Sequence, residues 1–231
     1  MFSKKLIAPL LTPFIATAIA ANVQAAEVSV QVTNLTAGMY FTPLFIAAHD
    51  DQFKAFELGM PASDELASLA EMGDGAGLGA MVTSYGGMTT SNNAEIRPGQ
   101  TSVAVDFDTG DAPYLTVASM LLPTNDAFFA MNQWMIPSEA GTYTLTVHAL
   151  DAGSEANNEI VGTGEPEDIP KPMFIENAGS GATGVNASAE NFVHLHRGGL
   201  GDDDLDGGAS DLVNSLHRWV GPVARITVVV K

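Results

Sequence analysis

The chain has 231 residues, contains no cysteine and carries a formal net charge of −18 at pH 7. A surface this acidic repels the phosphates of nucleic acids and of anionic lipids, so the charge excludes nucleic-acid binding and favours cations as ligands. The lack of cysteine excludes disulfides, thiol catalysis and zinc–thiolate sites, which leaves oxygen and imidazole atoms as metal ligands.

The beginning of the chain has the pattern of an export signal. Lys4 and Lys5 precede a mainly apolar segment, and small residues suit cleavage after Ala25 or Ala26. Residues 1–25 are therefore predicted to be a signal peptide, and the mature protein to be secreted, periplasmic or held at the cell surface. No later segment is apolar over the ~20 residues that a transmembrane helix needs, so no membrane insertion is expected after cleavage.

The remaining residues, 26–231, are predicted to form one β-rich domain. Alternating or continuous apolar patterns predict strands at 27–34, 41–48, 101–107, 114–122, 141–148, 191–196 and 223–230. Strands separated by turns predict an antiparallel β-sandwich with one or two short helices and long acidic loops.

Three segments are predicted to be helical or irregular. Ser63 is a candidate N-cap for a short helix with Leu66 and Leu69 on its buried face. The segment 73–87 contains six glycines and is predicted to be a mobile surface loop. Residues 127–131 are expected to form a short helix or a covered loop, and 211–219 a short helix or an irregular segment.

Carboxylates follow two of the predicted strands. Asp126 lies in the turn after the strand 114–122, and Asp151 and Glu155 lie in the turn after the strand 141–148. If these strand ends meet, three like charges converge, and only a cation makes that arrangement favourable. Ca²⁺ is the simplest candidate because it prefers six to eight oxygen ligands. Gly153 would let the second turn fold back towards the ion.

Four stretches together resemble the spondin domain. They are the block at 53–69, the run SMLLPTNDAFFA at 119–130, the turn DAGSE at 151–155 and the closing GPVARITV at 221–228. The spondin domain is a module of F-spondin-type extracellular matrix proteins that secreted bacterial chains also carry. The order of these stretches is similar to that of the family, and they extend over most of the predicted mature chain.

The resemblance implies a C2-like β-sandwich with a Ca²⁺ site at one end. The family places calcium carboxylates at the turn that matches Asp126 and at the turn that matches Asp151 and Glu155. Glu155 differs from the aspartate of the animal domains, and its longer side chain can still reach the ion. The implied function is binding or adhesion to an extracellular or cell-surface protein or glycan.

Two further groups are candidate metal sites. The acidic residues at 202–206 resemble an EF-hand loop only superficially, because no glutamate closes the loop, and a solvated acidic loop is favoured. His194 and His196 are two residues apart on a predicted strand, so both imidazoles could bind one copper or zinc ion. A third ligand would have to come from elsewhere in the chain.

The sequence therefore leaves three functions open. The first is a non-enzymatic calcium-binding module, supported by the carboxylates and by the lack of a nucleophile motif. The second is a copper or zinc metalloenzyme that uses His194 and His196. The third is a structural envelope protein without a ligand.

Overall fold

The computed structural model describes residues 26–160, 189–204 and 209–231. The predicted signal peptide and Asp206 lie outside the described residues. The strands are β1 (Glu27–Asn34), β2 (Tyr40–Phe41), β3 (Phe45–His49), β4 (Met88–Thr90), β5 (Val105–Asp108), β6 (Tyr114–Leu122), β7 (Ala127–Met135), β8 (Gly141–Asp151), β9 (His194–Leu195) and β10 (Pro222–Val230). The helices are α1 (Asp64–Met72), α2 (Ala76–Ser84) and α3 (Asn214–His217).

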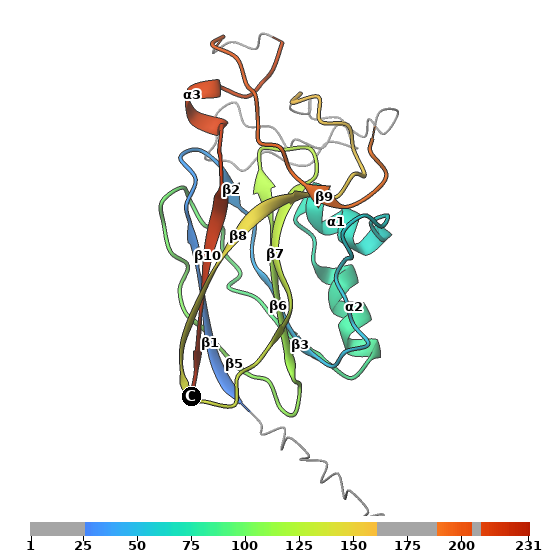
Figure 1. Ribbon diagram of the computed structural model, residues 1–231, viewed down its shortest axis with the longest axis vertical. Helices are drawn as coiled ribbons and strands as arrows, with labels where there is room; N and C mark the ends of the chain where they lie inside the picture. Colours follow the sequence, from blue (N-terminus) through green and yellow to red (C-terminus); the bar gives the residue numbers. More distant parts are fainter. Residues whose placement is uncertain (1–25, 161–188, 205–208) are drawn as a thin grey trace, which may run out of the picture.

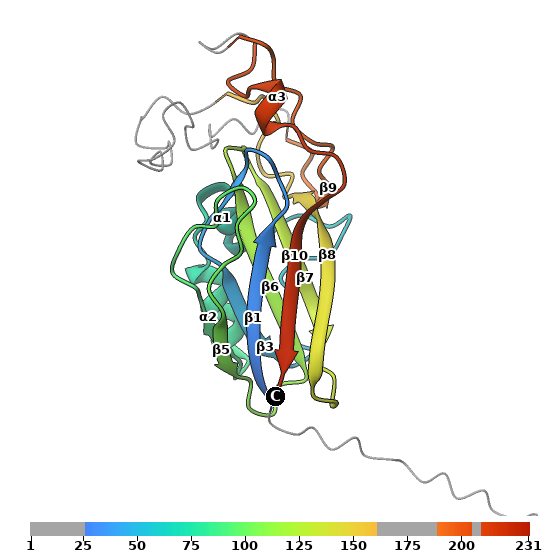
Figure 2. The ribbon, with the colours of Figure 1, turned by 90° about the vertical axis from the view of Figure 1, so that its left-hand side faces the viewer.

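The strands form one continuous antiparallel sheet. Its order is β4-β3-β6-β7-β8-β10-β1-β5, with β2 paired to β6 and β9 paired to β8. The first and last strands lie side by side along their length, with Val28 opposite Val230 and Asn34 opposite Ala224 (Figure 2). The all-β antiparallel prediction is confirmed.

Strand β8 joins the two halves of the sheet. Its residues up to His148 pair with β10, and its last three residues pair with β7. The long strand therefore carries the sheet from one half to the other, as Figure 1 shows. The sheet curls into a nearly barrel-like shape, so the structure shows an all-β fold without singling out a sandwich.

Two apolar clusters cover the two faces of the β3–β6–β7 half. The larger cluster lies inside the curled sheet and includes Val30 of β1, Phe129 of β7 and Ile226 of β10. The smaller cluster lies under the helices and includes Leu66 of α1 and Phe128 of β7. Strands buried on both faces lose the alternating apolar pattern.

This double burial explains why β7 was predicted wrongly. The segment 127–131, expected to be a short helix or a covered loop, is the start of a nine-residue strand. Phe129 and Met131 face the larger cluster while Phe128 faces the smaller one, so apolar residues occupy both sides. The same pattern in β6 was predicted correctly as a strand.

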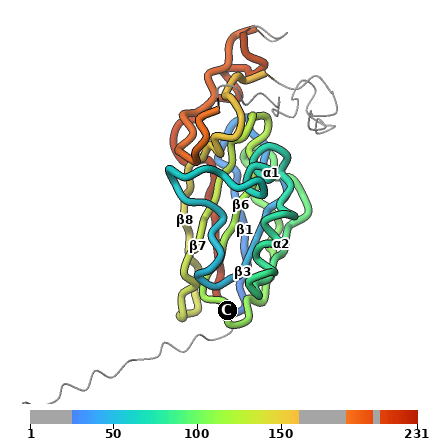
Figure 3. The backbone as a smooth tube through the Cα atoms, turned by 90° about the vertical axis from the view of Figure 1, so that its right-hand side faces the viewer, coloured from blue at the N-terminus to red at the C-terminus, as the bar shows by residue number. Residues whose placement is uncertain are grey.

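The helices α1 and α2 pack on the outer face of the sheet beside β3 and β6 (Figure 3). Helix α1 begins as predicted, because the Ser63 hydroxyl accepts the Leu66 N–H and satisfies one of the first-turn donors.

The prediction of a loop at 73–87 is wrong, because helix α2 lies within this segment. Leu78 and Val82, four residues apart, are fully buried, and a Cβ at Gly77 would contact the Glu65 side chain of α1. Close packing thus outweighs the low helix propensity of glycine.

Three predicted strands are shorter than expected. The 191–196 strand is reduced to the two residues of β9. The 41–48 strand divides into β2 and β3 on either side of Pro43, which has no N–H to give to a ladder. The 101–107 strand is reduced to β5, preceded by an isolated bridge between Thr101 and Thr33.

The loops after β8 and around β9 gather at one end of the sheet, opposite the C-terminus (Figure 1). The turn between β6 and β7 lies at this same end, because Ala127 pairs with Asp151. Within the described segments, no helix has the length and apolar content that crossing a lipid bilayer requires. The loop end is where the candidate site lies.

Candidate metal centre

The turn between β6 and β7 buries a carboxylate. Asp126 is completely buried, and its Oδ2 accepts hydrogen bonds from the backbone N–H groups of Ser154 and Glu155, at 2.8 and 3.1 Å. The Ser154 hydroxyl adds a longer contact to the same oxygen, at 3.3 Å. Asp126 therefore holds the turn after β8 in place through one of its two oxygens.

The other oxygen of Asp126 has no partner. Its Oδ1 is buried without a hydrogen bond. Burial, followed by the negative charge of Asp151, raises the pKa of Asp126 to about 7, and Glu155 adds to the increase. Two backbone N–H groups oppose the increase but do not cancel it. A buried carboxylate beside two others is costly unless a positive charge accompanies it.

Asp151 is the centre of the group. It ends β8, is 1% exposed, and accepts the Gly153 N–H through Oδ1 at 2.8 Å. Gly153 has φ = 67°, and a Cβ there would collide with the backbone of Phe192. The prediction that Gly153 lets this turn fold back is confirmed, since only glycine combines the left-handed conformation with so close an approach, whereas the ion that the turn would face stays a prediction.

Glu155, the third predicted residue, is also buried. It is 3% exposed, and its Oε2 accepts a long hydrogen bond from the Asn125 amide at 3.5 Å. Its backbone N–H bonds to Asp126, as described above. The structure thus brings Asp126, Asp151 and Glu155 to one end of the sheet as the sequence predicted, whereas their role as ligands stays a prediction.

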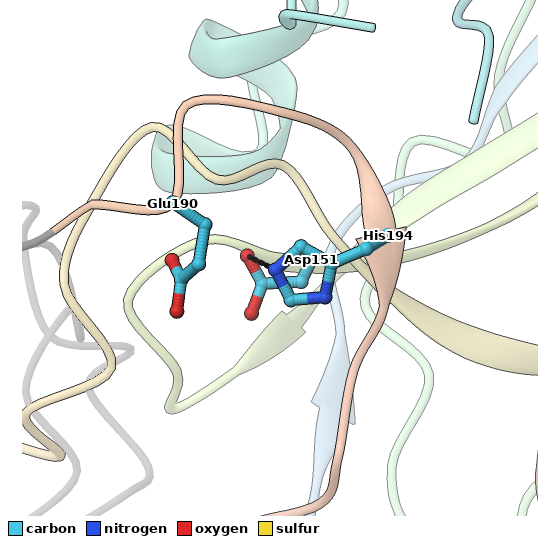
Figure 4. A group of neighbouring side chains, drawn as sticks. All are labelled: Asp151, Glu190 and His194. Carbon is cyan, nitrogen blue, oxygen red and sulfur yellow. Dashed lines mark ion pairs between the residues drawn. The ribbon is translucent and has the colours of Figure 1, made fainter. Parts of the chain in front are cut away.

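Two further side chains lie beside Asp151: Glu190, from the segment before β9, and His194, from β9 itself. Asp151, Glu190 and His194 each offer one ligand atom, and these atoms all lie within 4.8 Å of one another. Figure 4 shows the three side chains converging. The amide of Asn157 bridges the two carboxylates, because it donates to Asp151 Oδ2 at 2.7 Å and to Glu190 Oε1 at 3.3 Å.

Both predicted histidines face Asp151, one to each oxygen. His194 Nε2 lies 3.6 Å from Oδ1, and His196 Nε2 lies 3.9 Å from Oδ2. The His196 ring is buried against Trp219, and burial lowers its pKa although the charge of Asp151 opposes the change. Asp151 therefore belongs both to the predicted calcium site and to the histidine pair.

Glu190 and Asn157 were not predicted from the sequence. A usable signal existed for Glu190, since residues 190, 192 and 194 share one side of an extended segment. Asn157 lies in an irregular loop, and no local pattern marks it as a bridge between two carboxylates.

Two other regions, the acidic loop at Asp202 and a hollow beside α2, give less support for a functional site. Asp202 accepts backbone N–H groups from Asp204, Ala209 and Ser210, so its carboxylate closes its own loop, which agrees with the predicted solvated loop. A hollow of about 780 Å³ lies between α2 and β3. Its lining is apolar, glycine and hydroxyl residues without a titratable side chain, so it offers no acid, base or metal ligand.

No protein-family profile matches the chain, and no curated protein matches it in sequence. The resemblance to the spondin domain therefore stays an expectation from the four stretches that carry it.

Proposed function

We propose that this protein is an exported binding module whose loop end is ordered by a divalent cation, Ca²⁺, at Asp126, Asp151 and Glu155. The observation that carries the proposal is Asp126, a carboxylate buried beside two others with one oxygen free of hydrogen bonds. The charged groups that act on it are both negative. A bound Ca²⁺ would replace that repulsion by attraction and supply a partner for Oδ1.

The proposed ion would hold together segments that lie far apart in the chain. Asp126 belongs to the β6–β7 turn and Glu155 to the loop after β8, and the segment 189–193 bonds to that loop through Asn191 N–H and Gly153 O at 2.8 Å. Calcium at such a junction stabilises the folded state because it binds the folded chain and not the unfolded chain. The role that we assign to the ion is therefore to hold these loops together, not to take part in a reaction.

A surface next to the ion would meet the partner. Leu58 and Met60 are more than half exposed, as is Leu195, and Phe192 is 42% exposed. The two segments that carry them are joined by hydrogen bonds between Val193 and residues 59 and 60, each 2.8 Å long. Exposed apolar side chains that gather on neighbouring segments are typical of protein-binding surfaces. We infer an extracellular or cell-surface protein as the partner.

Hydrogen exchange tests the ordering role. Backbone amides at 152–158 and 190–196 should exchange more slowly in millimolar Ca²⁺ than in EDTA, while those of the β7–β8 hairpin at 136–140 should not change. Asp126→Asn should abolish the difference. Glu139→Gln, an equal change of charge at the opposite end of the sheet, should retain it. Equal exchange in Ca²⁺ and EDTA for the wild-type protein would refute the proposal.

A further inference from the structure

The two histidines that face Asp151 carry their protons on opposite nitrogens. His194 Nδ1 lies 3.0 Å from the carbonyl oxygen of Leu195, and a carbonyl can only accept, so Nδ1 of this ring is protonated. His196 Nδ1 instead accepts the backbone N–H of Gly198 at 3.0 Å, so its neutral ring is protonated on Nε2. His196 thus turns an N–H towards Asp151, whereas neutral His194 turns a lone pair.

A lone pair that faces two carboxylates is an unfavourable contact without a cation. His194 Nε2 is buried without a hydrogen bond, and so is Glu190 Oε2. Together with Asp126 Oδ1, these are the buried side-chain atoms in the described ranges that have no hydrogen-bond partner. All three adjoin Asp151, so the unsatisfied polar atoms concentrate at one place. Buried polar atoms in folded proteins are normally satisfied, and such a concentration points to a missing ligand.

We propose that Asp151, Glu190 and His194 bind a divalent transition metal ion of the zinc class. One imidazole nitrogen and two carboxylate oxygens suit zinc and its neighbours better than calcium, which prefers oxygen alone. Two ligands of a tetrahedral ion of this kind lie about 3.4 Å apart. The three ligand atoms lie within 4.8 Å of one another, so they would have to move closer together when the ion binds. The proposal goes beyond the calcium site, because Glu190 and His194 are not among the calcium carboxylates.

The surroundings match those of a metal-binding histidine. Such a histidine usually donates its other N–H to a carbonyl or a carboxylate, as His194 does to Leu195. Asn157 holds Asp151 and Glu190 from the outside with its two amide hydrogens. His196 is a positioning residue in this arrangement: its Nε2–H faces the second oxygen of Asp151. The expectation that both imidazoles bind one ion is therefore replaced by one imidazole and two carboxylates.

Calorimetric titration of the EDTA-stripped mature protein with Zn²⁺ tests the site. We expect one equivalent to bind, and His194→Ala and Glu190→Gln each to weaken it by about 100-fold or more. His148→Ala, which removes an exposed histidine of β8, should leave the affinity unchanged. Asp126→Asn should abolish the calcium response and retain zinc binding, so the two proposals can fail separately.

Histidine tautomers give a second readout that needs no metal. In a long-range ¹⁵N–¹H spectrum of the metal-free protein at pH 8, His194 should appear protonated on Nδ1 and His196 on Nε2. Zinc should then shift the Nε2 resonance of His194 alone. The proposal is overturned if zinc binds equally well to His194→Ala, or if the His194 ring carries both protons at that pH and forms an ion pair with Asp151.

Discussion

Polar side chains are buried at both ends of the sheet, around His49 at one end and around Asp151 at the other. The group around His49 is fully hydrogen-bonded, whereas the group around Asp151 is not. At the start of β6, His49 donates its Nδ1–H to the carbonyl oxygen of Asp50 at 2.6 Å and accepts the Thr116 hydroxyl proton at Nε2. Thr116 Oγ1 in turn accepts the backbone N–H of Gln133 at 3.1 Å. Each donor of this network meets an acceptor, so the ring is neutral and burial lowers its pKa.

At the opposite end, around Asp151, acceptors face one another. Asp126 Oδ1, Glu190 Oε2 and His194 Nε2 are buried and have no hydrogen bond. Burying polar atoms costs little folding free energy when every donor and acceptor has a partner, and much more when some are left without one. The hydrogen bonds of the first end are therefore complete within the protein, whereas the second end leaves three buried atoms without a partner, which is the observation behind the proposed cation sites.

The largest expected effect is the dependence of stability on pH in EDTA. The pKa of Asp126 rises from an ordinary 3.8 to about 7 on folding, so the folded state binds the proton more tightly than the unfolded state. The free energy of unfolding should therefore fall as the pH rises from about 4 to about 7, by roughly 4 kcal/mol from this group. Urea unfolding of the wild-type protein and of Asp126→Asn across this range measures it as a difference.

The comparison with Asp126→Asn is needed because buried histidines act in the opposite direction. Burial lowers the pKa of His49 and of His196, so their contributions to stability increase as the pH rises through this range. Both contributions are common to the two proteins and cancel. If the wild-type protein and Asp126→Asn have parallel pH profiles, the raised pKa assigned to Asp126 is wrong.

At the complete end, Thr116→Val should be destabilising whether or not metal is present. The change leaves His49 Nε2 and the Gln133 N–H without partners inside the protein, which costs about 1–3 kcal/mol. Chemical denaturation in EDTA and in Ca²⁺ should give the same loss. A loss that depends on Ca²⁺ would show that the two ends are not independent.

Asn157→Ala should act on metal affinity more than on folding. The side chain bridges Asp151 and Glu190, so removing it frees both carboxylates to move. We expect zinc affinity to fall by about 10-fold, at the lower end of the range for groups that orient metal ligands. Asn158→Ala is the matched control on the neighbouring residue, and an equal effect of the two changes would remove the orienting role of Asn157.

Ser154→Ala should have the smallest effect. The hydroxyl contact to Asp126 is 3.3 Å long, whereas the backbone N–H groups of residues 154 and 155 approach to 2.8 and 3.1 Å. Losing the hydroxyl should cost about 0.5 kcal/mol, at the low end for a hydrogen bond. A loss above about 2 kcal/mol in thermal unfolding would mean that the side chain, and not the backbone, holds Asp126.

The sequence predicted the strands whose patterns are local. The alternation in β1 and in most of β8 is visible without any knowledge of their neighbours, and both strands begin where they were expected. The sequence-based prediction was wrong for β7 and α2 because their residue patterns depend on the elements that pack against them. Strand β7 is buried on both faces, and the glycine at position 77 makes room for Glu65 of α1. The continuous curl through β8 also depends on pairing that no local pattern specifies.

The candidate site was predicted in part for the same reason. Asp126, Asp151 and Glu155 stand next to strand ends, so the pairing of β7 with β8 brings them together. Glu190 and His194 come from a segment about forty residues later, and their contact with Asp151 follows from how that segment crosses the turn at Gly153. The opposite tautomers of His194 and His196 depend on single backbone contacts that a sequence does not show.

Calorimetric titration of Ca²⁺ into the EDTA-stripped mature protein at pH 8 tests the central claim most directly, with wild type, Asp126→Asn and Glu139→Gln side by side. At this pH the Asp126 carboxylate is mostly ionised, so protons compete little with the metal. We predict one calcium site in the wild-type protein and in Glu139→Gln, and none in Asp126→Asn. Equal binding by all three proteins, or no binding by the wild-type protein, would contradict the assignment of this end of the sheet as a cation site.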